Sequence, residues 1–216
     1  MDIRNILSHV DHTLLKPDAV WEQVKTICDE AMEFGCATAC IPPSFVKEAV
    51  DYVQDNLKIC TVIGFPNGYS TMASKIFETK DAVENGACEI DMVINIGFVK
   101  ARKWQELTQE IAGVKAACLG RPLKVIIETS LLSDPEKVKL CQVVEKAGAD
   151  FLKTSTGFSS GGATKEDVAL LRKHLAPHIQ LKASGGIRTL EDAQAYLELG
   201  ADRLGASALI SKARKR

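Results

Sequence analysis

Two hydrophobic patterns alternate along the 216-residue chain. Short runs of branched and apolar residues end in polar or glycine-rich segments, which is typical of buried strands. Longer segments repeat their apolar positions with helical spacing. After a short opening helix with Ile3, Ile6 and Leu7 on its apolar side, the pattern predicts eight strands, at residues 8–12, 38–41, 59–63, 89–94, 123–127, 151–153, 180–183 and 202–204.

Helices are predicted between and after these strands. Several begin after a capping residue, such as Ser133 or Thr189, and four end at a glycine, which readily takes the left-handed conformation that closes a helix. The predicted helices span residues 19–34, 44–54, 71–85, 98–118, 134–147, 165–175, 189–199 and 206–212.

Eight strand–helix units without a linker predict parallel strands joined by right-handed crossovers. The simplest closed arrangement is an α/β fold of the (β/α)8 TIM barrel class, a single domain over residues 1–216. A doubly wound open sheet is the alternative. Its glycine-rich loop should follow the first strand, where this chain has Asp11-His-Thr-Leu-Leu15.

Composition excludes several classes of protein. A net charge of −1 argues against nucleic acid as a partner, because binding the phosphate backbone needs a concentrated basic surface. The basic residues at 212–216 are expected to form a solvated tail. The chain has neither a signal-peptide pattern nor an apolar run long enough to span a bilayer, so we expect a cytoplasmic protein without a membrane partner.

Cysteine and histidine spacing gives little support for a metal site. The seven cysteines include no Cys-x-x-Cys pair, and the four histidines show no His-x-His or His-Glu-x-x-His spacing. We therefore expect no metal site. Cys40, at the end of the second strand, is a candidate for the wall of a pocket. His12 either contacts a ligand or makes a local structural bond.

Glycine-rich loops follow the last three strands. In (β/α)8 enzymes the site lies at the C-terminal ends of the strands, and phosphate commonly binds near the last two loops. Ser184-Gly-Gly-Ile-Arg188 and Gly205-Ala-Ser207 fall there, each before a predicted helix whose free amides favour an anion. The pattern predicts a phosphate site, whereas the alternative is that these glycines only form tight turns.

Three charged residues are predicted inside the barrel. In Phe151-Leu-Lys153 and Gln180-Leu-Lys182, each central leucine points opposite to the lysine, so leucines that face the helices leave both lysines in the barrel mouth. The same alternation in Glu89-Ile-Asp-Met-Val-Ile-Asn95 places Asp91 inside. One carboxylate and two lysines should therefore converge on one cavity.

Two explanations fit this arrangement. The structural one is a buried ion pair between Asp91 and one lysine, which leaves the other lysine as a costly uncompensated cation. The chemical one is that two close ammonium groups disfavour each other's protonation, so that one amine is neutral near physiological pH. A neutral amine attacks a carbonyl to form a Schiff base, which permits C–C bond cleavage or formation. This reasoning does not distinguish the two lysines.

Four motifs together resemble deoxyribose-phosphate aldolase, a class I aldolase of the DeoC type, and the resemblance extends from about residue 8 to Ser207. They are Asp11-His-Thr-Leu-Leu15, Glu89-Ile-Asp-Met-Val-Ile-Asn-Ile-Gly97, Phe151-Leu-Lys-Thr-Ser-Thr-Gly-Phe158 and Leu181-Lys-Ala-Ser-Gly-Gly-Ile-Arg188.

The resemblance implies a carbon–carbon lyase that interconverts 2-deoxy-D-ribose 5-phosphate with D-glyceraldehyde 3-phosphate and acetaldehyde, in deoxyribose phosphate catabolism. It implies that Lys153 forms the Schiff base, that Lys182 perturbs it and aids proton transfer, and that Asp91 joins the proton relay. It also implies a homodimer or homotetramer without a cofactor. The residues matched to the phosphate-binding region are Gly185, Gly186, Gly205 and Ser207, bordered by Thr156 and Gly157.

Three other functions remain open from the sequence. A phosphosugar isomerase or epimerase on the same barrel would use carboxylate or metal chemistry and form no Schiff base. A phosphosugar-binding barrel would bind ligand without turnover. Another class I aldolase would use a different donor aldehyde. The paired inward lysines argue against the first two, and a substrate panel tests the third.

Overall fold

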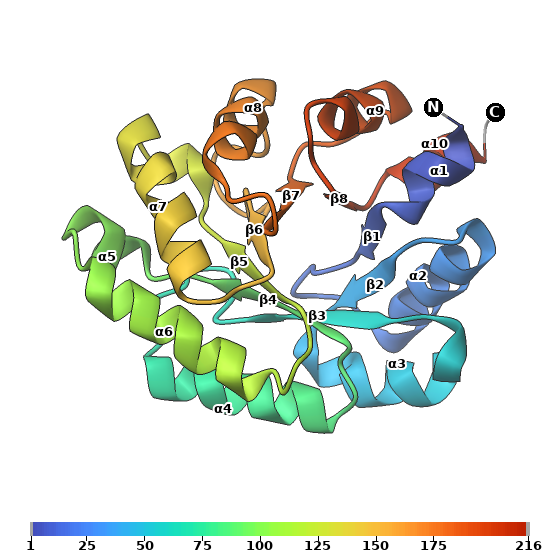
Figure 1. Ribbon diagram of the computed structural model, residues 1–216. Coiled ribbons are helices and arrows are strands. Elements are labelled where there is room, and N and C mark those ends of the chain that lie inside the picture. Colours follow the sequence, from blue (N-terminus) through green and yellow to red (C-terminus); the bar gives the residue numbers. More distant parts are fainter. Residues whose placement is uncertain (1, 215–216) are drawn as a thin grey trace.

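Eight parallel strands close into a barrel in sequence order, with β1 hydrogen-bonded to β8 (Figure 1). The structure is a computed structural model that describes residues 2–214. The predicted (β/α)8 fold is confirmed. The strands are β1 (Val10–Thr13), β2 (Thr38–Ile41), β3 (Ile59–Ile63), β4 (Glu89–Val93), β5 (Leu123–Ile126), β6 (Phe151–Lys153), β7 (Gln180–Ser184) and β8 (Arg203–Ala206).

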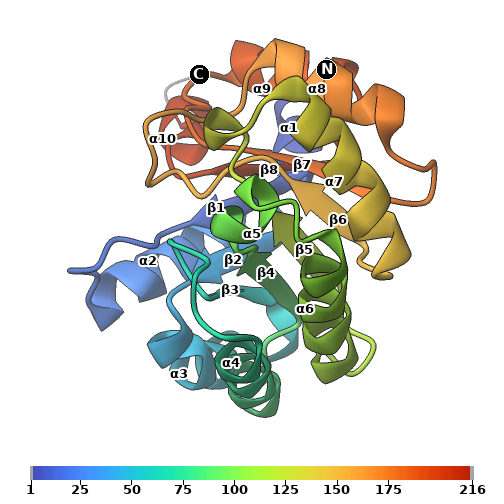
Figure 2. The same ribbon diagram turned by 90° about the vertical axis from the view of Figure 1, so that its left-hand side faces the viewer.

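Helices surround the strands, and α1 and α10 lie on the same side of the barrel (Figures 1 and 2). Three short 3₁₀ helices, η1 (Pro43–Phe45), η2 (Gln54–Asn56) and η3 (Thr129–Leu131), lie in the connections. The α-helices are α1 (Ile3–Ser8), α2 (Trp21–Phe34), α3 (Val46–Val53), α4 (Met72–Glu84), α5 (Ile96–Lys100), α6 (Trp104–Ala117), α7 (Asp134–Lys146), α8 (Lys165–His174), α9 (Leu190–Glu198) and α10 (Leu209–Ala213).

The predicted boundaries need correction at three places. The long helix predicted at 98–118 is two helices, α5 and α6, because Arg102 between them has a left-handed backbone (φ 56°) that interrupts the helical ladder. The first strand begins at Val10, since the opening helix extends to Ser8. The last helix begins at Leu209 instead of 206, because β8 continues to Ala206.

Alternation along the strands divides the protein into two interiors. The main apolar core lies between the strands and the helices and contains Leu152, Leu181 and Met92, as the pattern predicts. Inside the barrel, a small separate apolar cluster of Cys40, Cys60 and Val62 lies on the β2–β3 side, with Leu15 and Phe65 packed against it.

The loops after β6 and β7 pack directly on each other. A Cβ atom on Gly162 would lie 2.4 Å from the carbonyl oxygen of Gly185, so this contact requires glycine. The amide of the adjacent Ala163 donates to the carbonyl oxygens of Ser184 (2.9 Å) and Gly185 (3.1 Å). These bonds hold the two glycine-rich loops together at the C-terminal end of the barrel.

Within residues 2–214, no helix is long and apolar enough to cross a membrane.

Candidate active site

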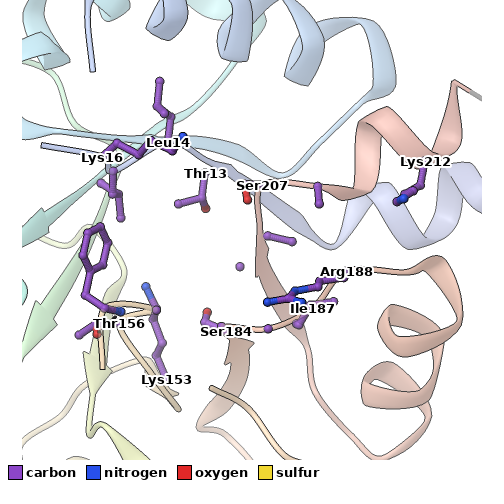
Figure 3. Close-up of a pocket in the computed structure, with 18 residues that line it drawn as sticks. Thr13, Leu14, Lys16, Lys153, Thr156, Ser184, Ile187, Arg188, Ser207 and Lys212 are labelled. Carbon is purple, nitrogen blue, oxygen red and sulfur yellow. Dashed lines mark hydrogen bonds between the residues drawn. The ribbon is translucent and has the colours of Figure 1, made fainter. Parts of the chain in front are cut away.

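A cavity of about 560 Å³ opens at the C-terminal ends of the strands, between the loops that follow β1, β6, β7 and β8 (Figure 3). Figure 3 shows Lys153 and Arg188 reaching toward it from opposite sides. Of the nine residues that the sequence singles out, seven line this cavity: Lys153, Thr156, Gly157, Gly185, Gly186, Gly205 and Ser207.

The remaining two residues lie below Lys153. Lys153 ends β6, and the parallel pairing of β6 with β7 sets it beside Lys182. Its ammonium nitrogen donates to Asp91 Oδ2 at 2.8 Å, and Lys182 donates to the same oxygen at 2.7 Å. The structure thus brings the predicted carboxylate and both lysines together.

The two lysines occupy different environments. Lys182 is fully buried and lies between two carboxylates, Asp91 and Asp11. Burial lowers the pKa of Lys182, but these carboxylates more than offset that effect and hold it above the usual range. Lys153 contacts the shared Asp91 oxygen and borders the cavity. The geometry therefore breaks the symmetry that the sequence leaves between them, because Lys182 keeps its proton.

Asp91 is the centre of the arrangement. Its Oδ1 accepts from Lys124 at 2.8 Å and from the thiol of Cys60 at 3.2 Å, while Oδ2 accepts from the two lysines above. Burial by itself raises the pKa of this carboxyl group, but Lys124, Lys153 and Lys182 together hold it well below its usual range. Asp91 is therefore an ionised acceptor for several donors.

Four charged residues in this interior were not predicted from the sequence. Lys124 on β5 is fully buried beside Asp91, and Arg203 on β8 bonds to Asp11 at 2.7 Å and to Glu89 at 3.0 Å. The strand alternation that identifies Asp91 also applies to Glu89, two residues earlier, and to Lys124, the polar residue within the run Leu123–Ile126.

These residues correct the predicted charge count. Within residues 2–214, the connected network contains one more cation than carboxylate, with Lys124, Lys153, Lys182 and Arg203 facing Asp11, Glu89 and Asp91. The expectation that a single carboxylate faces two lysines is wrong, since Asp11 also neutralises Lys182. A surplus of one positive charge nevertheless remains.

Among residues 2–214, two groups of possible metal ligands occur in the same interior. Cys40, Cys60 and Asp91 form one, and Asp11, Cys60 and Glu89 form the other. The ammonium group of Lys124 already bonds to Asp91, to Glu89 at 2.6 Å and to Cys60 at 3.3 Å. A buried lysine therefore takes the cation position among these donors.

The cavity wall is cationic. Besides Lys153, it includes Lys16, Arg188 and Lys212, and none of its lining residues in the described chain is a carboxylate. The hydroxyl oxygen of Ser184, also in this wall, is buried without a hydrogen-bond partner among residues 2–214. Positive charge, an available hydroxyl and glycine-rich loops together suit an anion such as phosphate.

The C-terminal segment differs from the predicted solvated tail. Lys212 lines the cavity, and Arg214 forms ion pairs with Glu30 at 2.9 Å and Glu33 at 2.7 Å on α2. Residues 215 and 216 of that prediction lie outside the described residues.

Two further candidates have structural positions. The ring nitrogen Nε2 of His12 lies 2.8 Å from Glu30 on α2, outside the barrel, which fits the local structural bond. Cys40 is fully buried in the apolar cluster with Cys60 and is not among the residues that line the cavity.

Glu128 is another residue that sequence reasoning missed. It follows β5, has a left-handed backbone (φ 53°) and is almost fully buried. Its Oε2 accepts from both the amide and the hydroxyl of Thr156, whereas Oε1 has no partner in the described chain. Such backbone strain in a non-glycine residue often marks a functional region. Here the carboxylate fixes the start of the loop that follows Lys153.

Comparisons with known proteins all point to aldolases. The family model described as DeoC/LacD family aldolase matches residues 6–212. The chain is 49% identical over 207 residues to the deoxyribose-phosphate aldolase of Clostridioides difficile (strain 630), a match that covers 96% of this chain and 94% of the relative. It is 53% identical over 210 residues to the protein of that name from Streptococcus pyogenes serotype M4, with 97% and 94% covered.

Solved structures show the same similarity. An aldolase named QR15 superposes with a TM-score of 0.94 at 35% identity, and the match covers 98% of this chain and 97% of the other. A tetrameric deoxyribose phosphate aldolase from Aeropyrum pernix superposes with a TM-score of 0.91 at 32% identity. This match covers 99% of this chain and 92% of the Aeropyrum pernix chain.

Proposed function

This chain belongs to the DeoC/LacD family of aldolases, and from that premise we propose that it is a deoxyribose-phosphate aldolase. The reaction is reversible cleavage of 2-deoxy-D-ribose 5-phosphate to D-glyceraldehyde 3-phosphate and acetaldehyde through a Schiff base. The relatives that share about half of its sequence over nearly its whole length carry this name. The family resemblance seen in the four sequence motifs is thereby confirmed.

Lys153 is the proposed nucleophile. The single observation that carries this assignment is the charge distribution around it, since the barrel interior has a surplus cation and Lys153 is the lysine of the network that borders the cavity. Arg203 stays charged at any physiological pH, and Lys124 and Lys182 each contact more than one carboxylate. In the described chain, Lys153 contacts a single carboxylate and is the lysine of this network that the substrate can reach.

In the proposed cleavage, the neutral amine of Lys153 attacks C1 of the open-chain sugar, and loss of water gives an iminium ion. The C3 hydroxyl then loses its proton, the C2–C3 bond breaks, and its electron pair moves to the iminium, which becomes an enamine. Glyceraldehyde 3-phosphate leaves. Protonation of the enamine at C2 and hydrolysis release acetaldehyde and restore Lys153.

Asp91 and Lys182 are proposed to move the protons in these steps. They share one hydrogen-bonded network directly below Lys153. Lys182 supplies a donor that remains charged, and Asp91 supplies an ionised acceptor. In the synthetic direction, a water molecule held by this pair would remove the proton from the methyl carbon of the acetaldehyde adduct.

The phosphate group is proposed to bind at Gly185, Gly186, Gly205 and Ser207, with Thr156 and Gly157 at the border. The cationic wall of the cavity supports this placement. Arg188, at the end of the predicted loop, and Lys212, which was not predicted in the site, add positive charge, and charge-assisted bonds to phosphate are among the strongest available.

The network also bears on the rival functions. An isomerase, an epimerase or a binding barrel has no need for a lysine that a surplus of buried positive charge makes neutral. A class I aldolase with another donor remains the nearest rival. No cofactor is required in this proposal. The proposal further includes a cytoplasmic enzyme of deoxyribose phosphate breakdown that assembles as a homodimer or homotetramer, and a relative from Aeropyrum pernix is tetrameric.

The test is a coupled turnover assay with deoxyribose 5-phosphate, in which triose phosphate is detected as it forms. We expect turnover by the wild type, loss of at least about a thousandfold in Lys153→Ala, and unchanged turnover in Lys165→Ala, an exposed lysine control. Retained turnover in Lys153→Ala would remove the Schiff-base assignment. A panel of donor aldehydes then separates this enzyme from other class I aldolases.

A further inference from the structure

Lys124 has no place in the reaction scheme, yet it is fully buried inside the barrel. It occupies the β5 position that pairs with Asp91 on β4. It does not line the cavity, so it has no route to the substrate. A buried cation at the centre of an active-site network needs a physical explanation.

The contacts of Lys124 hold its charge in place. Its ammonium nitrogen lies 2.6 Å from Glu89 Oε2 and 2.8 Å from Asp91 Oδ1, and also contacts Cys60. Burial lowers the pKa of Lys124, but Asp91 and the other acidic groups raise it well above its usual range. Lys124 is thus a fixed positive charge that occupies Oδ1, so that Oδ2 is the oxygen shared by the other two lysines.

We propose that Lys124 is a positioning residue whose fixed charge creates the surplus of one cation and thereby keeps Lys153 neutral. This inference rests on the proposed role of Lys153 as the nucleophile. Without Lys124, the network would contain three cations and three carboxylates, and Lys153 would complete the balance as an ammonium ion.

The charged and titratable groups around Lys124 and Lys153 come from six strands. Asp11 lies on β1 and Arg203 on β8, Lys182 lies on β7, and β4 contributes both Glu89 and Asp91. Two thiols, Cys40 on β2 and Cys60 on β3, lie in the same interior. On the cavity side, the wall that Lys153 borders carries Lys16, Arg188 and Lys212. Burial and the hydrogen bond with Cys40 raise the pKa of Cys60, so the Cys60 thiol stays neutral and does not alter the count, whereas the same hydrogen bond lowers the pKa of Cys40.

The size of the effect follows from the geometry. Lys124 and Lys153 bond to opposite oxygens of one carboxylate, which puts their nitrogens roughly 6 Å apart. At an effective dielectric constant of about 20, two unit charges at that separation change each other's proton affinity by about two pH units.

The experiment measures kcat/KM for deoxyribose 5-phosphate against pH in four forms of the enzyme. These are the wild type, Lys124→Met, Glu89→Gln and the double variant. We expect the acid limb of the profile to move up by about two pH units in Lys124→Met, with activity regained at alkaline pH. The limb should move down in Glu89→Gln, which adds to the surplus. In the double variant the surplus is again one, and the limb should return to within about half a pH unit of the wild type.

Each alternative outcome is distinguishable. If Lys124→Met lowers kcat/KM equally at every pH, Lys124 is a structural residue and the inference fails. If Lys124→Met does not fold, Glu89→Gln still decides, because an unchanged acid limb there contradicts the charge count. If the wild type shows no turnover, the proposed function is overturned. If the wild type is active but Glu89→Gln and Lys124→Met both keep its pH profile, only this inference is overturned.

Discussion

Replacing Asp91 by asparagine perturbs the network at its centre while preserving the shape of the side chain. Asp91 accepts hydrogen bonds from Lys124, Lys153, Lys182 and Cys60 through its two oxygens. An asparagine offers one acceptor oxygen and turns an amide N–H₂ group toward a lysine. The network would then contain four cations and two carboxylates, so its positive surplus rises from one to two.

The expected loss of stability is large. Removing one partner of a buried ion pair costs about 3–5 kcal/mol, because the opposite charges remain buried without compensation. For a domain of this size, each kcal/mol lowers Tm by about 2–4 °C, so Asp91→Asn should melt roughly 6–20 °C below the wild type. Differential scanning calorimetry or thermal circular dichroism measures this shift.

Activity and Schiff-base formation should separate in this variant. Turnover should fall about 10²- to 10⁴-fold, the range expected when a general acid or base is removed. The larger positive surplus favours a neutral Lys153, so borohydride should still trap an acetaldehyde adduct on the folded protein. Turnover within tenfold of the wild type, or a folded variant that cannot be trapped, would refute this reasoning.

A matched double variant separates the two contributions of Asp91. Adding Lys124→Met to Asp91→Asn restores a surplus of one cation, so it should recover part of the lost Tm. It should not recover turnover, because the proton acceptor is still absent. Recovery of both quantities would show that Asp91 acts through charge balance alone.

Two further predictions concern the cavity. Gly205→Ala places a Cβ 2.3 Å from Ser184 Oγ and 3.2 Å from Lys182 Cε. This overpacking should cost about 1–3 kcal/mol of stability and lower kcat/KM at least tenfold. The control is Gly113→Ala, whose new Cβ meets the end of the Ile76 side chain at 3.0 Å and should leave kcat/KM unchanged. Urea melts and the coupled assay measure both effects, and equal behaviour of the two variants would contradict the close packing seen at Gly205. Arg188→Gln should raise KM for deoxyribose 5-phosphate about 10- to 100-fold and leave the KM for unphosphorylated 2-deoxyribose unaltered, since Arg188 contributes charge to the cavity wall. Acetaldehyde release measures the reaction of both substrates, and an equal rise in KM for both would mean that Arg188 shapes the cavity instead of binding phosphate.

The fold was predictable from the sequence because its signals are local and repeated. Strand alternation, capping residues and closing glycines such as Gly35 and Gly148 each act within a few residues, and both glycines have the positive φ that their positions predict. The break between α5 and α6 at Arg102 was not predictable, because a left-handed backbone is unusual for arginine and no proline or glycine lies there to indicate it.

The positions of the predicted site residues also followed from the sequence. Lys153, Lys182 and Asp91 sit where alternation in short strands puts them, and the glycine-rich loops gather around one cavity. The carboxylate that neutralises Lys182 was not identified, because Asp11 is 171 residues away in sequence and only barrel closure brings them together. The same is true of Arg203 and Glu89, which are separated by 114 residues.

Residues that act through long-range placement account for the rest. Lys212 belongs to the basic segment at 212–216, and sequence alone does not show that its side chain lines the cavity. Glu128 gave no signal because its bond to Thr156 depends on the loops after β5 and β6 meeting. Only the three-dimensional structure provides these contacts, and with them the charge count that singles out Lys153.

The most direct test of the central claim is chemical trapping at Lys153. The wild-type protein is incubated with acetaldehyde and sodium borohydride, and its peptides are mapped by mass spectrometry. The account predicts one reduced two-carbon adduct, located on Lys153 and absent from Lys124 and Lys182. An unmodified Lys153, or an adduct found only on Lys182, would contradict it.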